Sequence, residues 1–354
     1  MTRKLLALVA VAVVCWPAGA ADKPVELGKV PWLRDYDQAL KQAAKEQKLV
    51  FILFDEVPGC HTCQLFGTGP LSHPVVVDAA ARCFVPVAVY NNVKGKDLDI
   101  LKQFKEPAWN NPVFRFLDAE GKDIIPRKDG VWTTAGVLAR MVQALEAAKQ
   151  PVPDYLRLVA DEHNPKKRAT ATFAMFCYWE GEKNLGKLDG VLATRIGMLH
   201  RAEVVEVDFD PERLPYEKLV AAAQEMKCAS KVFTRNEQQQ EQAAKLVGAR
   251  AQRTDEPVDT KTIQQYHLAH SPAYHYLPLT ALQATKVNAA LASREAPDRF
   301  RSPGQLALQD RLATVVKADR KALASLKPDR TAKGLIKYHE ELERTLAGLE
   351  KQTP

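Results

Sequence analysis

The stretch KLVFILFDEVPGCHTC, residues 48–63, decides the fold of the N-terminal half of the chain. In residues 48–54, Lys48 is followed by six apolar residues in a row, which is typical of a β-strand buried on both faces of a sheet. Cys60 and Cys63 follow where this strand is expected to turn into a helix. The N–H groups and the dipole of a helix N-terminus stabilise a thiolate there. Cys60 is therefore the predicted nucleophile, and Cys63, one turn deeper, is the predicted resolving thiol.

The elements expected around this pair complete a recognisable order. They are a helix at 36–46, a strand at 84–90, a helix at 97–104, a hairpin of 112–117 with 123–125, and a helix at 134–148. With CHTC after the buried strand and Asn111-Pro112 before the hairpin, this order resembles the thioredoxin family over about residues 30–150. The resemblance implies an α/β thioredoxin fold and a cis peptide bond before Pro112. The backbone groups beside that bond would be free to pair with a substrate strand.

The cysteine pair has a second interpretation as half of a zinc site. No second pair at metal-ligand spacing follows it, so we predict redox-active cysteines without a metal or other cofactor. His61 either stabilises the thiolate or is a solvated side chain. Cys83 is expected to open the strand at 84–90 as a small core residue.

A second domain is predicted from the way the pattern restarts after Pro151. Residues 169–175 are an apolar strand, and Cys177 again stands where a strand turns into a helix. FCYWEGE at 176–182 resembles the nucleophile motif of the A-type peptide methionine sulfoxide reductases. Four further stretches agree with that family in the same order, and they lie at 194–197, 201–211, 230–238 and 265–267.

This resemblance implies an α+β domain and a role for each matching residue. Cys177 matches the nucleophile, Tyr178 and Trp179 match the aromatic pair that holds the substrate methyl group, and Glu203 matches the proton donor. A thiolate at a helix N-terminus and a carboxyl group beside apolar residues suit these roles chemically.

The second domain also departs from the family at three places. A tyrosine-bearing loop is missing after Ile196, the position of a second tyrosine holds Cys228, and Met175-Phe176 replace two glycines. Cys228 either resolves a sulfenic acid on Cys177 as a disulfide, which the first domain then reduces, or is a buried core cysteine in a domain that has lost catalysis.

Two other features of this half carry less weight. Glu182 is expected to be a surface carboxylate rather than a second acid. His267, His270 and His275 form a patch with Tyr266, Tyr274 and Tyr276 that offers ligands for a metal, but Tyr266-His267 already matches the family, so we predict no metal there.

The first residues predict export. Arg3 and Lys4 precede an apolar run at 5–16, and Ala18-Gly19-Ala20 follows, which is the pattern of a secretory signal peptide cleaved near Ala20. We therefore expect the mature protein in the periplasm or outside the cell, without a membrane anchor. Its five cysteines, at 60, 63, 83, 177 and 228, cannot all pair within one chain.

Four segments are thus expected: a signal peptide at 1–20, a thioredoxin-like domain at 21–150, a reductase-like domain at 151–280 and a helical tail at 281–354 packed on the second domain. Loss of Arg3 and Lys4 lowers the net charge from +7 to +5. Because the basic residues are interleaved with acidic ones, we expect no nucleic-acid partner.

Three functions fit these features. The first is an exported thiol-disulfide oxidoreductase that couples the cysteine pair to methionine sulfoxide reduction by the second domain. The second is a disulfide reductase or isomerase whose second domain only binds substrate. The third is a non-enzymatic protein that binds a metal or haem precursors. For the first two, the expected partners are oxidised proteins, which carry disulfides or methionine sulfoxide, and an upstream thiol reductant.

Overall fold

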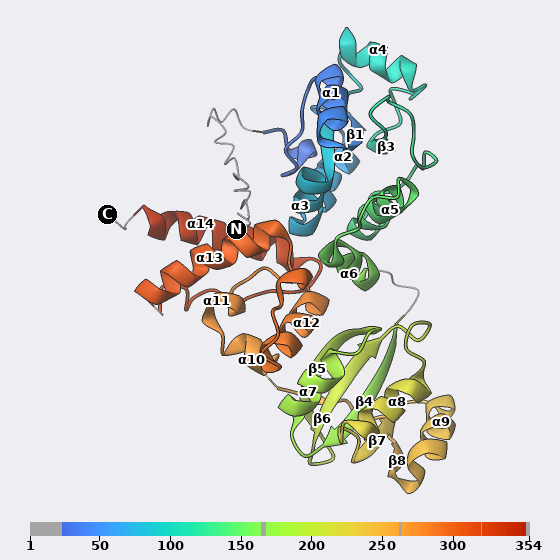
Figure 1. Ribbon diagram of the computed structural model, residues 1–354, viewed down its shortest axis with the longest axis vertical. Coiled ribbons are helices and arrows are strands. Elements are labelled where there is room, and N and C mark those ends of the chain that lie inside the picture. Colours follow the sequence, from blue (N-terminus) through green and yellow to red (C-terminus); the bar gives the residue numbers. More distant parts are fainter. Residues whose placement is uncertain (1–22, 164–167, 262–263, 320, 352–354) are drawn as a thin grey trace, which may run out of the picture.

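The computed structural model describes residues 23–163, 168–261, 264–319 and 321–351. The predicted signal peptide at 1–20 lies outside the described residues. Figure 1 shows an N-terminal domain and a second domain at opposite ends, with a helical tail beside them. No helix within the described ranges is long and apolar enough to cross a membrane.

The N-terminal domain has a three-stranded sheet in the order β2-β1-β3. Its strands are β1 (Leu49–Asp55), β2 (Phe84–Tyr90) and β3 (Val113–Leu117), and its helices are α1 (Tyr36–Glu46), α2 (His61–Thr68), α3 (Pro74–Cys83), α4 (Lys96–Gln103) and α5 (Thr134–Ala147). β1 runs parallel to β2 and antiparallel to β3. This central position explains why every residue of β1 is buried.

The alternation of side chains along β1 builds a core on each face of the sheet. Phe51 and Leu53 join the cluster beneath α3 and α5, and Val50, Ile52 and Phe54 join the cluster beneath α1 and α4. The first cluster also includes Tyr155, Leu156 and Val159 of α6 (Asp154–Glu162). The first core therefore reaches past residue 150, into the segment expected to begin the second domain.

Two details differ from the expected elements. Of the second hairpin strand, expected at 123–125, only an isolated bridge between Leu117 and Asp123 forms. Cys83 is the last residue of α3 and is half-buried, so it ends a helix instead of opening a strand. The cause is a third helix that begins at Pro74 and fills the stretch before β2.

The second domain contains a six-stranded sheet in the order β8-β7-β4-β6-β5-β9. Its strands are β4 (Ala169–Met175), β5 (Val191–Leu199), β6 (Ala202–Phe209), β7 (Lys231–Thr234), β8 (Ala251–Arg253) and β9 (Asp259–Thr260), and its helices are α7 (Tyr178–Gly186), α8 (Tyr216–Glu225) and α9 (Glu237–Val247). The pairing is antiparallel except between β7 and β8. The domain is thus a mixture of helices and strands.

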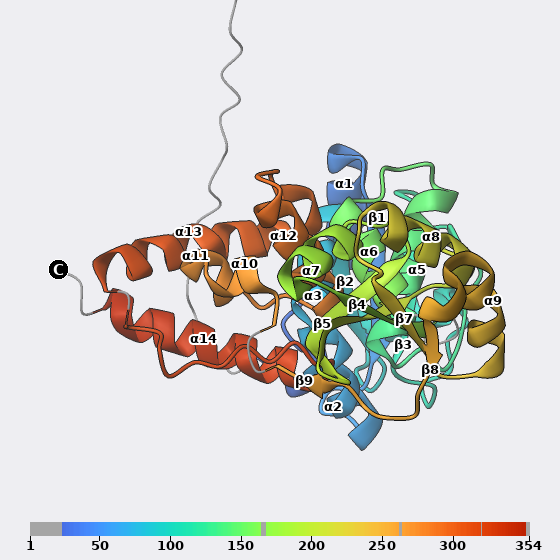
Figure 2. The same cartoon turned by 90° about the horizontal axis from the view of Figure 1, so that it is seen from below.

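The C-terminal part is helical, as expected. Its helices are α10 (Tyr266–Ala269), α11 (Pro272–His275), α12 (Ala281–Ala292), α13 (Pro303–Ala318) and α14 (Gly334–Glu350). Capping boxes begin α12 at Thr280 and α13 at Ser302. α13 and α14 extend side by side away from both domains (Figure 2) and share one apolar cluster.

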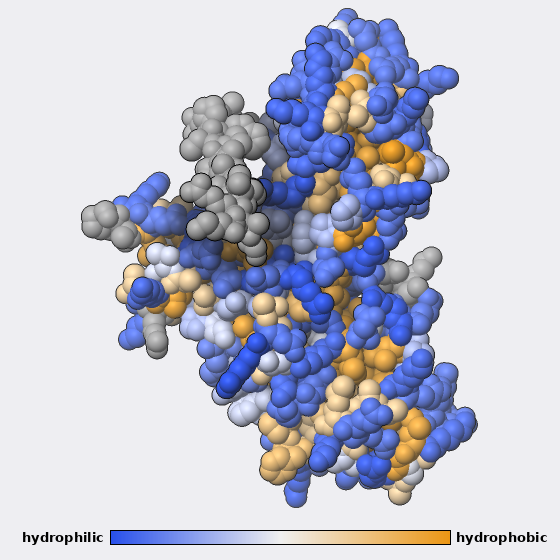
Figure 3. All heavy atoms as spheres, in the orientation of Figure 1, coloured by the Kyte–Doolittle hydropathy of each residue, from blue (hydrophilic) through white to orange (hydrophobic). Residues whose placement is uncertain are grey.

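The tail packs on both domains and not only on the second. Lys286 of α12 donates hydrogen bonds to carbonyl groups at the end of α7. Asp78 of α3 accepts hydrogen bonds from the Ser302 hydroxyl and, at 3.0 Å, from the Gly304 N–H at the start of α13. The face seen in Figure 3 is mostly hydrophilic, with hydrophobic residues in separate patches on both domains. Through these hydrogen bonds the tail contacts both the first and the second domain.

Candidate functional site

The predicted cysteine pair lies at the N-terminus of α2. Cys60 is the N-cap residue and Cys63 belongs to the first turn, and their Sγ atoms are 3.2 Å apart. Cys60 is exposed and Cys63 is buried. A hydrogen bond from the backbone N–H of Cys63 lowers the pKa of the Cys60 thiol. The geometry thus gives one accessible, activated thiol above one protected thiol.

Asp55, the last residue of β1, lies beneath the pair, and the sequence analysis missed it. Burial raises the pKa of its carboxyl group to about 7, although the N–H of Glu56 donates a hydrogen bond to it at 2.9 Å. Burial also raises the pKa of the Cys63 thiol, and Asp55 raises it further. The available signal was an acidic residue at the end of an apolar run, five positions before the first cysteine of the C-x-x-C motif.

A second residue that sequence reasoning missed is Asn111. Its Oδ1 atom lies 2.8 Å from the Cys63 Sγ and 3.8 Å from the Cys60 Sγ. The peptide bond between Asn111 and Pro112 is cis, as expected. The Pro112 carbonyl accepts a hydrogen bond from Trp132 Nε1 at 3.0 Å, which occupies one of the two lone pairs of this oxygen. The role of Pro112 in substrate binding stays a prediction.

A group of side chains that could hold a metal ion lies at the cysteine pair. Within the part of the chain that the structure describes, Glu56, Cys60 and Cys63 are the one such group, with ligand atoms within 4.8 Å of one another. The histidine patch lies elsewhere, on α10 and α11. There the centres of the His270 and Tyr266 rings are 4.1 Å apart. The Nδ1 atom of His270 also forms a hydrogen bond with the Tyr266 carbonyl oxygen at 2.8 Å.

A second cluster forms around Cys177, the N-cap residue of α7. Glu203 of β6 accepts a hydrogen bond at 2.8 Å from the N–H of Tyr178, the residue after Cys177. The rings of Tyr178 and Trp179 contact each other at 5.6 Å, and Trp179 stacks on Tyr266 at 4.2 Å. The structure therefore brings together the predicted nucleophile, acid and aromatic pair, and adds Tyr266 to them.

Cys228 lies in the apolar core of the second domain, close to this cluster. Its Sγ is 3.8 Å from Asn184 Nδ2 of α7 and 3.4 Å from the Met226 carbonyl oxygen. Burial raises the pKa of the Cys228 thiol, and the Cys177 thiol raises it further. Cys228 is thus both a buried core residue and a neighbour of Cys177, and both interpretations of it stay open.

The expectation that Glu182 is a surface carboxylate was wrong. Only 1% of Glu182 is exposed. Its carboxylate accepts hydrogen bonds from the N–H groups of Gln265 and Tyr266, at 2.8 and 3.1 Å, and from Asn288 Nδ2 at 3.3 Å. Burial raises its pKa to about 7. The physical reason is that α12 of the tail covers this face of α7, which a local pattern does not reveal.

The two cysteine clusters lie in different domains. Figure 1 shows α2 in the upper domain and α7 in the lower one, with α6 and the tail between them. Although both domains belong to one chain, Cys60 and Cys63 therefore do not lie next to Cys177 in this arrangement.

Comparison with known proteins agrees with the fold of the first domain. The family described as thioredoxin-like matches residues 31–119. Among solved structures, a DsbH oxidoreductase is 18% identical over 37% of this chain and 95% of its own, with a TM-score of 0.29. A thioredoxin from Thermus thermophilus is 24% identical over 32% of this chain and 86% of its own, with a TM-score of 0.28. No curated protein matched the chain. Residues 31–119 are thus a thioredoxin-like domain.

Proposed function

We propose that the thioredoxin-like domain is a thiol-disulfide oxidoreductase with Cys60 as nucleophile and Cys63 as resolving thiol. The observation that carries this proposal is the asymmetry of the pair. The exposed Cys60 thiol has a lowered pKa, and the buried Cys63 thiol, 3.2 Å away, has a raised one. An accessible thiolate can attack the disulfide of a substrate, and a buried thiol reacts only after the mixed disulfide with the first cysteine has formed.

The reaction proceeds by two exchanges. The Cys60 thiolate attacks one sulfur of a substrate disulfide, which forms a mixed disulfide and releases the other sulfur as a thiolate. Cys63 then loses its proton and attacks the Cys60 sulfur, which releases the second substrate thiolate and leaves a disulfide between Cys60 and Cys63. Two electrons pass from the protein to the substrate, and an external dithiol must return them before the next cycle.

Asp55 serves the second step as proton acceptor. Cys63 is buried and its pKa is raised, so it needs a nearby base to become a thiolate. The pKa of Asp55, about 7, allows its carboxyl group to take that proton near neutral pH. An oxidised protein is the proposed substrate, and Trp109, which is 83% exposed and stands two positions before Asn111 in the chain, offers apolar surface to it. Export to an oxidising compartment remains part of this proposal.

The test is reduction of insulin disulfides with dithiothreitol as electron source. Cys60→Ser abolishes the activity, while Cys177→Ser and the control Cys83→Ser leave it near the wild-type rate. Activity that survives in Cys60→Ser would refute the assignment of the nucleophile. The metal-binding alternative is tested by alkylation of Cys60 and Cys63 during a titration with Zn²⁺. Protection of both thiols by one equivalent of Zn²⁺ would favour that alternative.

A second candidate function, reduction of methionine sulfoxide, rests on the cluster around Cys177. Cys177 would attack the sulfoxide sulfur while Glu203 protonates the oxygen. This step yields methionine and a sulfenic acid on Cys177. Condensation of that acid with the Cys228 thiol would release water and form a disulfide, which an external dithiol reduces. The Tyr178 N–H to Glu203 hydrogen bond supports this function because it fixes the acid beside the nucleophile.

Its test is dithiothreitol-driven reduction of free and peptide-bound methionine sulfoxide. If the second domain is active, turnover disappears in Cys177→Ser and persists in Cys60→Ser, because the two clusters lie apart. Absence of turnover in a protein that still reduces insulin would show that only the first domain is catalytic.

A further inference from the structure

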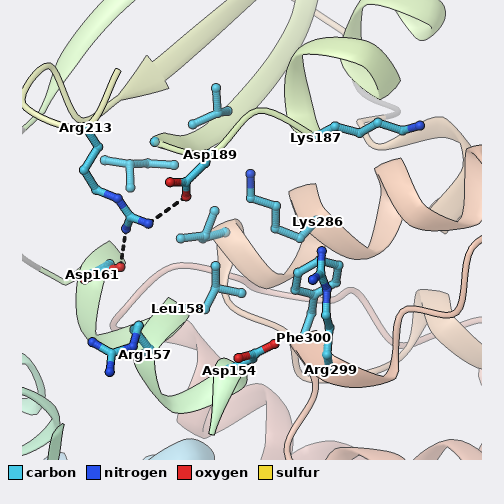
Figure 4. Close-up of a pocket in the computed structure, with 14 residues that line it drawn as sticks. Asp154, Arg157, Leu158, Asp161, Lys187, Asp189, Arg213, Lys286, Arg299 and Phe300 are labelled. Carbon is cyan, nitrogen blue, oxygen red and sulfur yellow. Dashed lines mark hydrogen bonds and ion pairs between the residues drawn. The ribbon is translucent and has the colours of Figure 1, made fainter. Parts of the chain in front are cut away.

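A pocket of about 340 Å³ lies where the first domain, the second domain and the tail meet (Figure 4). α6 forms one wall, and the segment between α7 and β5 forms another. The tail contributes α12 and the 3-10 helix Asp298–Phe300. The pocket is separate from both cysteine clusters, and the thiol chemistry proposed above does not use it.

Two of the three acidic residues on its wall are already neutralised. Arg213 forms ion pairs with both Asp161 and Asp189, the latter at 2.6 Å, as the dashed lines in Figure 4 show. This arrangement holds both carboxylates against one guanidinium group. The third, Asp154, is exposed, and Figure 4 places it at the opposite end of the pocket from the Lys286 ammonium group.

Lys286 is a buried cation that forms no ion pair with a carboxylate of the described residues, and Asp189 attracts it only from a longer distance. It is 8% exposed, and its Nζ atom donates hydrogen bonds to the carbonyl groups of Gly186 and Leu188 at 2.9 and 2.7 Å. An ammonium group has three N–H donors, so one remains. No carboxylate of the described residues forms an ion pair with it, and burial lowers its pKa to about 8. Keeping a charge away from water without a partner is unfavourable.

Arg299 is a second cation on the wall without an acidic partner in the described ranges. Its guanidinium carbon lies 4.6 Å from the centre of the Phe300 ring. The other two basic side chains are already paired, Arg157 with Glu146 at 2.8 Å and Lys187 with Glu295 at 3.4 Å. Lys286 and Arg299 are therefore the two cations available to a ligand.

Apolar side chains complete the pocket. Leu158 comes from α6, Leu282 from α12 and Phe300 from the adjoining 3-10 helix. The volume corresponds to roughly ten water molecules at about 30 Å³ each, which is room for a small organic molecule. The pocket thus combines two unpaired cations with an apolar surface.

We propose that this pocket binds a small organic monoanion, namely a carboxylate carried on a short apolar body. The carboxylate accepts hydrogen bonds from Lys286 and Arg299. The apolar body lies against Leu158, Leu282 and Phe300. Such a ligand contacts α6 and the tail, and through Lys286 it is linked to the carbonyl groups of Gly186 and Leu188 in the second domain.

Calorimetric titration of the purified protein with sodium hexanoate tests the proposal. Hexanoate binds, and its affinity falls about tenfold or more in both Lys286→Met and Arg299→Gln, because each variant removes a charge-assisted hydrogen bond. Lys187→Met is the matched control, since Lys187 already pairs with Glu295 at the rim, and it binds like wild type. Hexanol, with the same body and no charge, does not displace hexanoate.

A second readout follows the Lys286 ammonium group itself. In protein that carries ¹³C-labelled lysine without chemical modification, hexanoate raises the pKa of Lys286. The signal of this residue is the one that is missing from the Lys286→Met spectrum. Because Arg299 is at the surface and not part of a core, Arg299→Gln keeps the test valid even if Lys286→Met unfolds. The proposal is overturned if hexanoate does not bind at about 10 mM, a weak affinity by any standard. It is also overturned if both variants bind like wild type, or if inorganic phosphate binds as tightly as hexanoate.

Discussion

Replacing Asp55 with Asn should remove the pH dependence of stability that arises from this buried carboxyl group. The pKa of Asp55 is raised from 3.8 to about 7 by burial, so the folded state holds this proton more tightly than the unfolded state does. At roughly 1.4 kcal/mol per pH unit, this difference corresponds to at most about 4 kcal/mol. The stabilisation is fully present below pH 3.8 and is lost as the pH rises through about 7.

The assay is chemical denaturation of the reduced protein between pH 4 and pH 8, followed for wild type and Asp55→Asn. The free energy of unfolding of wild type should fall relative to that of the variant across this range, by up to about 4 kcal/mol. Asp37→Asn, which alters an exposed acid of α1, is the control and should follow wild type. A ¹³C titration of the Asp55 carboxyl group with a midpoint near 4, or identical profiles for wild type and Asp55→Asn, would refute the reasoning.

Two further outcomes are expected. Iodoacetamide at pH 7 should modify Cys60 well before Cys63, because the Cys60 thiol is exposed and has a lowered pKa, whereas the Cys63 thiol is buried and has a raised pKa. Peptide mass spectrometry measures the order of modification, and equal rates at the two cysteines would contradict the prediction. Gly304→Ala should destabilise the protein by about 1–3 kcal/mol, because a Cβ atom there would lie 2.5 Å from the Asp78 carboxylate oxygens. In the control Gly348→Ala, the new Cβ meets no atom within 4 Å, so its thermal midpoint should be unchanged or higher.

The sequence determined the central strand of the first domain and the helix start that carries the cysteine pair, but it did not indicate α3. The apolar run at 48–54 predicted the buried central strand, and the C-x-x-C motif after it predicted an exposed and a buried cysteine at a helix N-terminus. These inferences succeed because strand burial and helix-terminus chemistry depend on residues that are neighbours in the chain. The same holds for β4 and for Cys177 at the start of α7.

Only the tertiary structure decided which distant groups meet. Asn111, just before β3, contacts Cys63 of α2, and Asp55 acts on the same thiol from beneath. Glu182 is buried because α12 returns to cover it. The hydrophobic periodicity of the sequence does not indicate these contacts. They depend on how separate elements dock and not on the spacing of residues within one element. The same docking buries Lys286 at the junction of three parts of the chain, where no carboxylate of the described residues forms an ion pair with it.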